Sequence, residues 1–352
     1  MRSAFHCIST RQLSVAAQGL KFTSFAVGGG TPLILDEGQL EELFCLAELF
    51  GVHPSRVFTS VETSPEYTQK SVLRQLRARG VERLSMGVQS FNETELKKLK
   101  RRPGLGTVVG ALENIVEAGF PQFNLDLIYG IEGQTVESFM RSLNTALTYR
   151  PNELFIYPLY VRPGTRIDVR STDDIGYAIY KSARELLVGQ GFVQTSMRRF
   201  VRRETTETEF SCGDEVMLSC GAGGRSYLGN LHYATPYAVR QQAIADEIDH
   251  YIRTTDFMTA ANGFLLSTEE MQIRFIIKNL MYHRGVDLAE YEKRFGEKPD
   301  RNLFREFTDR GWIEETGRIV RLTEEGMAYS DYIGQAFISP VVRKLMSEYV
   351  YP

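Results

Sequence analysis

The sequence predicts an α/β fold with a parallel sheet, followed by a small domain that mixes helices and strands. Apolar runs with strand character lie near residues 22–27, 57–61, 84–88, 123–128 and 154–159. Each run is followed by a stretch with helical character, which gives units of roughly 30 residues typical of βα repeats. We therefore expect these five strands to form one parallel sheet.

Two of the expected helices carry recognisable start signals. Asp36 with Gln39 three residues later resembles a capping box, and Ser64 places a capping residue before Pro65 at the first helical position. Residues 1–19, in contrast, show neither a signal-peptide core nor a helical pattern. Residues 1–20 are therefore expected to form a separate N-terminal segment.

Composition excludes several classes of protein. At 352 residues the chain is long enough for one large domain and a smaller one. Its formal net charge is -3, from 41 Lys and Arg against 44 Asp and Glu, which provides no overall attraction to nucleic acid or to an anionic membrane. No apolar run reaches the roughly 20 residues of a membrane span. Four cysteines without a secretory segment favour the reducing cytoplasm.

Glycine and polar residues follow the strands at regular spacing. The segment 26–32 is Ala-Val-Gly-Gly-Gly-Thr-Pro, and three glycines after an apolar run let the backbone approach a bound ligand closely. Similar polar endings occur in segments 60–65, 83–91 and 124–130. Because parallel barrels place ligand chemistry at the carboxyl ends of their strands, we expect a ligand site there.

Three polar side chains stand out within these strands. Glu62 ends its strand with a carboxylate, which can accept hydrogen bonds from ribose hydroxyls. Gln89 offers both a donor and an acceptor. Asp126 interrupts an otherwise apolar strand, and a buried carboxylate is costly unless it is paired or faces a cavity. A ligand contact accounts well for Asp126.

These motifs, together with Gly133-Gln134-Thr135 and Pro163-Gly164-Thr165, resemble the oxygen-independent coproporphyrinogen III oxidase family of radical S-adenosylmethionine (SAM) proteins, which includes heme chaperones. The resemblance runs from about residue 20 to the C-terminus. It implies an open (β/α)6 partial TIM-like barrel over 21–200, here without its first strand. A glycine-rich connecting region over 201–262 and a winged-helix-like α+β domain over 263–352 would follow.

The resemblance also implies that SAM is bound by residues at the strand ends, namely Gly29, Gly30, Thr31, Glu62, Gln89, Arg101, Asp126 and Tyr160. The glycine loop and Thr31 would accept hydrogen bonds from the methionine ammonium, and Glu62 and Gln89 would hold the ribose and methionine portions. Arg101 would pair with the SAM carboxylate. Arg102 competes for that role, and a solvated helix end is the alternative explanation of this basic run. No catalytic residue follows from the sequence.

One family motif does not occur in these 352 residues. Relatives hold a [4Fe-4S] cluster with a Cys-x3-Cys-x2-Cys loop, whereas Cys7, Cys45, Cys212 and Cys220 lack that spacing. We therefore expect neither cluster ligation of that kind nor SAM cleavage. An N-terminal truncation, which we favour, and a natural cluster-free relative are the two interpretations. Either would leave strand 22–27 at a sheet edge, which predicts poor solubility or dimerisation.

The remaining cysteines and histidines form no convincing metal motif. His6 next to Cys7 lacks further partners, and ordinary thiols explain Cys212 and Cys220 near His232 better than metal ligands do. The segment 219–227 resembles a later glycine motif of the family, with Arg225 where many members carry histidine. This segment could form a loop that packs under the barrel mouth, or it could contact the substrate, and the sequence leaves both interpretations open. Glu132 also replaces a proline of the family pattern.

The C-terminal segment shows signals for three helices and a strand. Ser267 with Glu270 resembles a capping box for a helix that Gly285 would end. A second helix over 304–312, a strand over 319–322 and a last helix from Thr323 complete a winged-helix-like pattern. The segment mixes acids and bases without a basic stripe, so nucleic acid binding is disfavoured.

The resemblance thus implies a radical SAM oxidoreductase of the coproporphyrinogen III oxidase-like type, inactive as these 352 residues. The alternative is a heme-binding, chaperone-like protein or a cluster-free binding protein. Heme needs an axial ligand, for which the sequence offers His53, His232, His250 and His283. The expected partners are therefore SAM and a porphyrinogen or heme.

Overall fold

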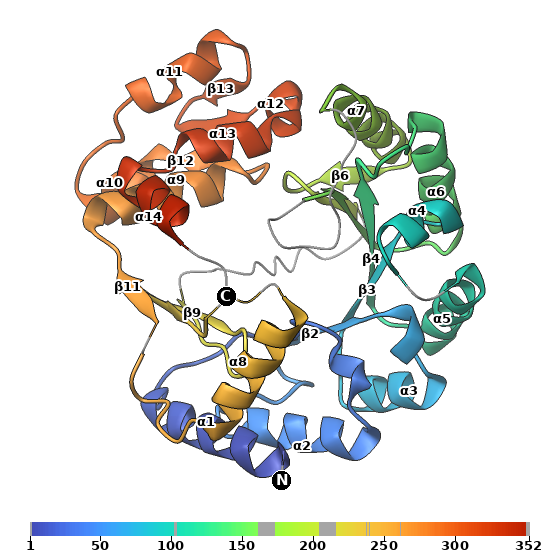
Figure 1. Ribbon diagram of the computed structural model, residues 1–352. Coiled ribbons are helices and arrows are strands. Elements are labelled where there is room, and N and C mark those ends of the chain that lie inside the picture. The colour runs from blue at the N-terminus through green and yellow to red at the C-terminus, as the bar shows by residue number, and fades with distance from the viewer. Residues whose placement is uncertain are drawn as a thin grey trace.

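The computed structural model describes residues 2–101, 104–160, 173–203, 216–236, 238, 240–260 and 262–349, with the side chains of 2–8 and 173 left aside. Figure 1 shows the strands of the large sheet on the inner side of an arc, with helices α2 to α7 along its outer side. A C-terminal group of helices and a small sheet with α8 complete the arrangement. The predicted α/β class is confirmed.

The described residues form a seven-stranded central sheet in the order β1-β2-β3-β4-β5-β7-β6. Its strands are β1 Ser24–Val27, β2 Phe58–Thr63, β3 Arg83–Gln89, β4 Gln122–Tyr129, β5 Glu153–Pro158, β6 Phe192–Gln194 and β7 Arg199–Arg202. The strands β1 to β5 are parallel, as the sequence predicts. Strands β6 and β7 form an antiparallel hairpin, which pairs with β5 through β7.

The outer helices are α2 Glu37–Glu48, α3 Lys70–Ala78, α4 Glu93–Lys98, α5 Leu105–Ala118, α6 Val136–Thr148 and α7 Asp173–Gly189. The predicted capping box of α2 is confirmed, because Asp36 and Gln39 exchange both hydrogen bonds. The predicted start at Pro65 is wrong as an α-helix start. A short 3-10 turn (η2, Pro65–Tyr67) forms there, and α3 begins only at Lys70.

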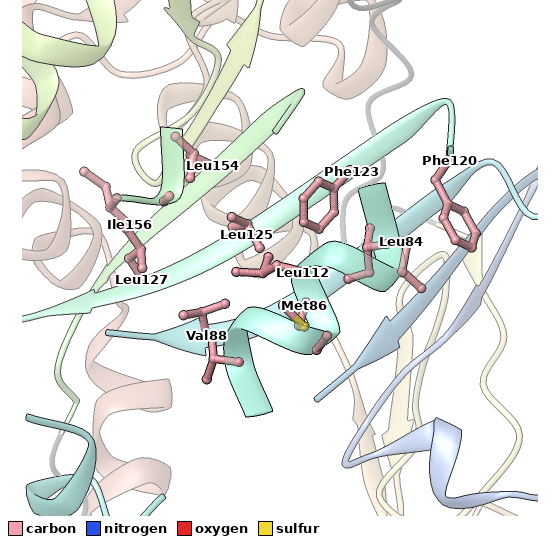
Figure 2. Packing of buried hydrophobic residues seen from close by; sticks show 14 of the residues in the cluster. Leu84, Met86, Val88, Leu112, Phe120, Phe123, Leu125, Leu127, Leu154 and Ile156 are labelled. Atoms are coloured by element: carbon pink, nitrogen blue, oxygen red, sulfur yellow. The ribbon is translucent and has the colours of Figure 1, made fainter. Parts of the chain in front are cut away.

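The main hydrophobic core lies between the sheet and these helices. Alternate residues of β3 and β4, such as Leu84, Met86 and Leu125, are fully buried against Leu112 of α5 (Figure 2). Because successive strand residues point to opposite faces, the residues between them face the inside of the arc. On β2 to β4 that inner face carries polar side chains such as Glu62, Ser85 and Asp126, and it carries the candidate site.

The N-terminal residues form a helix, α1 Arg2–Ala16, which corrects the expectation that residues 1–19 lack a helical pattern. Tertiary contacts explain it. The Gln12 side chain donates to the Thr255 carbonyl and accepts from the Phe257 amide, while Leu13 is buried. Strand β1 follows and has one neighbour, β2, so it forms the edge of the sheet within the described part of the chain.

The glycine-rich connecting region contains more structure than its composition suggests. Its described residues form helix α8 Gln241–Arg253 and strands β8 Val216–Met217, β9 Arg225–Leu228 and β10 Leu231–Ala234, which make a four-stranded antiparallel sheet with β11 Gly263–Leu265 from the start of the following segment. The loop before β9 is tied down by Tyr251, whose hydroxyl accepts from the Gly221 amide at 2.9 Å. The predicted loop is therefore held by its own sheet and by α8.

The C-terminal part has its own buried core around Ile276, Leu280 and Val320. Its elements are α9 Thr268–Leu280, β12 Val286–Asp287, α10 Leu288–Phe295, α11 Asn302–Asp309, β13 Ile313–Thr316, β14 Ile319–Leu322, α12 Glu324–Ala328, α13 Ser330–Ala336 and α14 Pro340–Glu348. Ser267 caps α9 as predicted, but the helix ends at Leu280 rather than at Gly285. The helix predicted from Thr323 is short and is followed by two more. Across the described residues, no helix is long and apolar enough to cross a membrane.

Candidate functional site

The carboxyl ends of β1 to β4 bring the predicted glycine loop, Glu62, Gln89 and Asp126 to one edge of the sheet. In the sheet register, Glu62 pairs with Ser85, and Asp126 pairs with Gly87. Both carboxylates lie on the inner face of the arc. The sequence prediction that these side chains share one edge is therefore consistent with the strand order.

The glycine loop is held by Glu62. The Gly29 amide donates to Glu62 Oε2 at 3.2 Å, and a Cβ on Gly28 would lie 2.8 Å from the Glu62 carboxyl carbon. Gly29 and Gly30 have φ values of 81° and 111°, which residues with a side chain rarely adopt. Thr31 follows and makes no side-chain capping bond to the next turn. Gly29 and Gly30 are thus favoured by their backbone conformation, whereas a side chain at Gly28 would have to displace the end of the Glu62 side chain. The loop places backbone groups at the site.

Gln89 adopts a strained backbone conformation at the end of β3. Its φ is 73°, in the left-handed region that costs a residue with a Cβ roughly 1 kcal/mol. The strand register shifts between Gly87 and Gln89, and the Gln89 amide nitrogen would lie 2.6 Å from a Cβ on Gly87. The amide therefore folds back over Gly87. Strain of this kind is often kept where a side chain must be aimed at a ligand.

Asp126 is the carboxylate whose pKa is most affected by its surroundings at this edge. Burial raises its pKa from 3.8 to about 6, while the hydrogen bond from Asn124 and the charge of Arg83 act in the opposite direction. The Asn124 amide nitrogen donates to Asp126 Oδ1 and to Ser85 Oγ, both at 2.7 Å. Asn124 Oδ1 is buried without a partner among the described residues. The site therefore contains an acceptor that a ligand donor could satisfy.

The two remaining residues predicted to bind SAM are Arg101 and Tyr160. Arg101 is exposed beyond α4, and its side chain makes no hydrogen bond or ion pair within the described residues. Arg102, its competitor, lies outside the described residues, as does the Pro163-Gly164-Thr165 motif. The Tyr160 hydroxyl donates to Asp331 Oδ1 of α13 at 2.8 Å, so its phenol contacts the C-terminal part. The proposed contacts of Arg101 and Tyr160 with SAM stay predictions.

The opposite end of the inner face holds a buried ion-pair network that the sequence analysis missed. Glu153 is fully buried and accepts from Arg83 at 2.9 Å and from Arg199 at 2.6 Å. Arg83 also donates to Ser60 Oγ. Burial acts to raise the pKa of Glu153, but the two guanidinium groups outweigh it and hold that pKa below its ordinary value. The signal available in the sequence was a charged residue at the start of each of two apolar strands.

The Gly-Gln-Thr motif has a structural role. Gln134 is buried, and its side chain accepts from the Gly130 amide at 2.8 Å and donates to Glu95 Oε2 at 2.9 Å. Ser90 and Ser138 donate to the same buried carboxylate. Glu132, which replaces the family's proline, has a partner in Lys98 at 3.6 Å. The turn after β4 is therefore held by side chains rather than by a proline.

The described residues contain no group of three His, Cys, Asp or Glu side chains suited to a metal ion. Cys45 and Cys220 are exposed thiols, Cys212 lies outside the described residues, and nothing is described of the Cys7 side chain. His232 is buried against the Tyr227 ring, with its pKa lowered to about 4 by burial and by Arg274. The side chains that the structure describes therefore form no site for an iron-sulfur cluster.

The remaining histidines occupy ordinary positions. His283 Nδ1 lies 3.0 Å from the Thr195 carbonyl, His53 lies 3.7 Å from Glu48, and His250 is exposed in the last turn of α8. None of them is near the carboxylates of the sheet edge in the described contacts.

Two family models match the chain. The one described as Radical SAM superfamily matches residues 11–146, and the one described as HemN C-terminal domain matches residues 266–329. The chain is 27% identical over 334 residues to the heme chaperone HemW of Bacillus subtilis, a match that covers 89% of this chain and 84% of that protein. These matches include both the sheet with its glycine loop and the C-terminal core.

The chain also resembles oxygen-independent coproporphyrinogen III oxidases. It is 35% identical over 292 residues to that of Salmonella typhimurium, a match that covers 76% of this chain but 62% of that protein. The solved structure of coproporphyrinogen III oxidase (HemN) from Escherichia coli, described as a radical SAM enzyme, superposes with a TM-score of 0.79. At 22% identity, that match covers 96% of this chain and 82% of the other. The likeness in structure shows a shared fold.

Proposed function

The chain belongs to the HemN- and HemW-type radical SAM family, and on this premise we propose that it binds SAM at the carboxyl ends of β1 to β4. The observation that carries the proposal is the contact between Glu62 and the glycine loop. Glu62 fixes the loop through the Gly29 amide and occupies the space that a Cβ on Gly28 would need. A simple tight turn requires glycines at positive φ but no carboxylate packed against it.

Three further groups support the same site. Gln89 is held in a strained conformation, Asp126 is a buried carboxylate, and Asn124 Oδ1 is an unsatisfied buried acceptor among the described residues. Hydroxyl and ammonium donors are the groups that such acceptors favour. SAM offers both, on its ribose and its methionine portion. Bound to a cluster in relatives, SAM supplies radical chemistry, whereas the residues here would bind and orient it.

We expect a protein made of these 352 residues to bind SAM without cleaving it. The sequence contains no Cys-x3-Cys-x2-Cys motif, and the described side chains offer no cluster site. The family relationship points to a porphyrinogen as the second ligand, in line with the coproporphyrinogen III oxidases among the relatives.

Calorimetric titration with SAM tests the binding step. Saturable binding is expected, and Glu62→Gln should weaken it because the introduced amide provides one acceptor oxygen where the carboxylate provides two. Glu66→Gln, close in sequence but in the η2 turn, is the matched control and should bind like the wild type. The absence of saturable SAM binding would disprove the proposal. Anaerobic incubation with a strong reductant tests the second step, since formation of 5'-deoxyadenosine would contradict the expected lack of cleavage.

A second candidate function is heme binding, because HemW heme chaperones match the chain over most of their length. Of the candidate axial ligands, His250 is exposed and the His53 side chain is 41% exposed. Titration with hemin should then give a saturable Soret band, and His53→Ala and His250→Ala would identify the ligand. A Soret band that does not saturate would argue for adventitious binding and against this second function.

A further inference from the structure

The tip of the β6–β7 hairpin, residues 195–198, reaches into the C-terminal part of the chain. The Met197 amide donates to the Met281 carbonyl at 3.0 Å, and the His283 amide donates to the Thr195 carbonyl at 3.0 Å. The Met197 side chain packs against the C-terminal core. The hairpin tip is thus joined to the end of helix α9 by paired backbone bonds.

The same hairpin is built into the central sheet. Strand β7 pairs with β5, and the Ile156 amide donates to the Arg198 carbonyl at 3.0 Å. The next residue, Arg199, binds the buried Glu153. Displacement of the hairpin tip would therefore be transmitted to β5, whose carboxyl end borders the candidate site.

Arg198 connects the two parts through its side chain. It is only 4% exposed, its guanidinium donates to the Tyr160 hydroxyl at 2.9 Å, and it forms an ion pair with Asp331 of α13. The Tyr160 hydroxyl in turn donates to Asp331. The three side chains make a closed set of charge-assisted hydrogen bonds, which are stronger and more directional than neutral ones.

Tyr160 is the second residue after the end of β5. The preceding residue, Leu159, donates its amide to the Tyr129 carbonyl at 2.7 Å, which holds the end of β5 against the end of β4. Strand β4 carries Asp126 on its inner face. A short path of contacts therefore connects the C-terminal part with the site. It runs from Asp331 through Tyr160 to the ends of β5 and β4.

We propose that Arg198 is a positioning residue, which couples the docking of the C-terminal part to the geometry of the SAM site by holding Tyr160 against Asp331. The inference rests on the proposed SAM site for its functional meaning. The side-chain contacts among Arg198, Tyr160 and Asp331 are polar, and polar contacts between domains permit relative movement. Two further contacts of the same interface are also polar, from Tyr177 to Glu325 and from Arg184 to Glu324.

The variants Arg198→Gln and Asp331→Asn test this coupling, with two measurements on each. Coupling energies between sites are commonly large enough to change affinity about fivefold or more. Each variant should therefore weaken SAM binding by about fivefold, and the double variant should weaken it no further, because both remove the same contact. Arg198→Lys retains the charge opposite Asp331 and should recover most of the affinity. Arg301→Gln, which removes an exposed ion pair within the C-terminal part, is the control and should have no effect.

Hydrogen exchange of the Leu159 amide provides a measurement that does not depend on SAM. This amide bonds β5 to β4, so its exchange should accelerate in Arg198→Gln and Asp331→Asn, but not in Arg301→Gln. If the wild type bound no SAM, the proposed function would fail while the exchange result would still decide the coupling. Unchanged exchange at Leu159 would overturn the inference. Faster exchange with unchanged SAM affinity would also overturn it, because the contact would then be merely structural.

Discussion

The Glu62 carboxylate packs against Gly28 where a larger residue would carry its side chain. A Cβ placed on Gly28 would lie 2.8 Å from the carboxyl carbon of Glu62. The contact explains why the glycine run begins at residue 28, although Gly28 does not have a positive φ. It also links the first two strands of the sheet at the candidate site.

Gly28→Ala is therefore expected to displace the Glu62 side chain and to break its bond with the Gly29 amide. The displaced carboxylate would also lose its proposed charged hydrogen bond to SAM, which corresponds to about a tenfold weaker SAM affinity. Stability should change by less than about 1 kcal/mol, because the end of a flexible side chain can move at low cost. Gly106→Ala, in an open part of α5, is the control and should stabilise the helix slightly. Calorimetry and thermal unfolding would show whether binding is affected more than stability.

Asp126 should make the protein less stable as the pH rises from about 4 to about 6. The folded state takes up the proton near pH 6 and the unfolded chain near 3.8, so the folded state binds more protons within this interval. The effect amounts to at most about 3 kcal/mol. Asp126→Asn should remove it, which urea denaturation at pH 4.5 and pH 7 would measure. Glu113→Gln, at an exposed position of α5, should leave the pH dependence as in the wild type.

His232 should act in the opposite direction over nearly the same pH range. Burial, with Arg274, lowers its pKa to about 4, whereas the unfolded chain protonates near 6.5. Stability should thus fall as the pH decreases from about 6.5 to about 4. His232→Phe keeps the ring beside Tyr227 and removes a buried nitrogen that lacks a partner among the described residues. The variant should be more stable than the wild type at pH 5, and a variant less stable there would contradict the assignment. His250→Gln is the exposed control.

The Arg83–Glu153–Arg199 network should be essential for folding. Glu153→Gln would leave two buried guanidinium groups without a counter-charge, which costs about 3–5 kcal/mol. The control, Glu315→Gln, breaks an exposed ion pair and should cost no more than about 1 kcal/mol. Denaturation midpoints of the two variants would separate a buried network from a surface pair, and equal losses would refute the distinction.

Much of the central sheet could be predicted from the sequence because its strands are local features. Five apolar runs of strand length, each followed by a helix, correspond to β1 to β5 within a few residues. The glycine loop, Glu62 and Gln89 were also found because each departs from the apolar pattern at a strand end, and Asp126 was found because it interrupts an apolar strand. Such departures are visible without knowledge of the tertiary structure.

The contacts that could not be predicted join residues far apart in the chain. Arg198 and Asp331 are separated by 133 positions, and Arg83 and Glu153 by 70. Neither pair has a local pattern, since each partner alone resembles an ordinary surface charge. Helix α1 was missed for the same reason, because Gln12 finds its partners at residues 255 and 257. Side-chain pairs that form only in the folded protein produce no local pattern from which a single sequence could predict them.

At Gln89 the residue best for stability differs from the residue best for ligand binding. Glycine would adopt its φ of 73° without steric strain, but glycine has no amide to lay over Gly87. A library randomised at residue 89 and sorted for resistance to heat should therefore become enriched in glycine, whereas one sorted for ligand capture should retain glutamine.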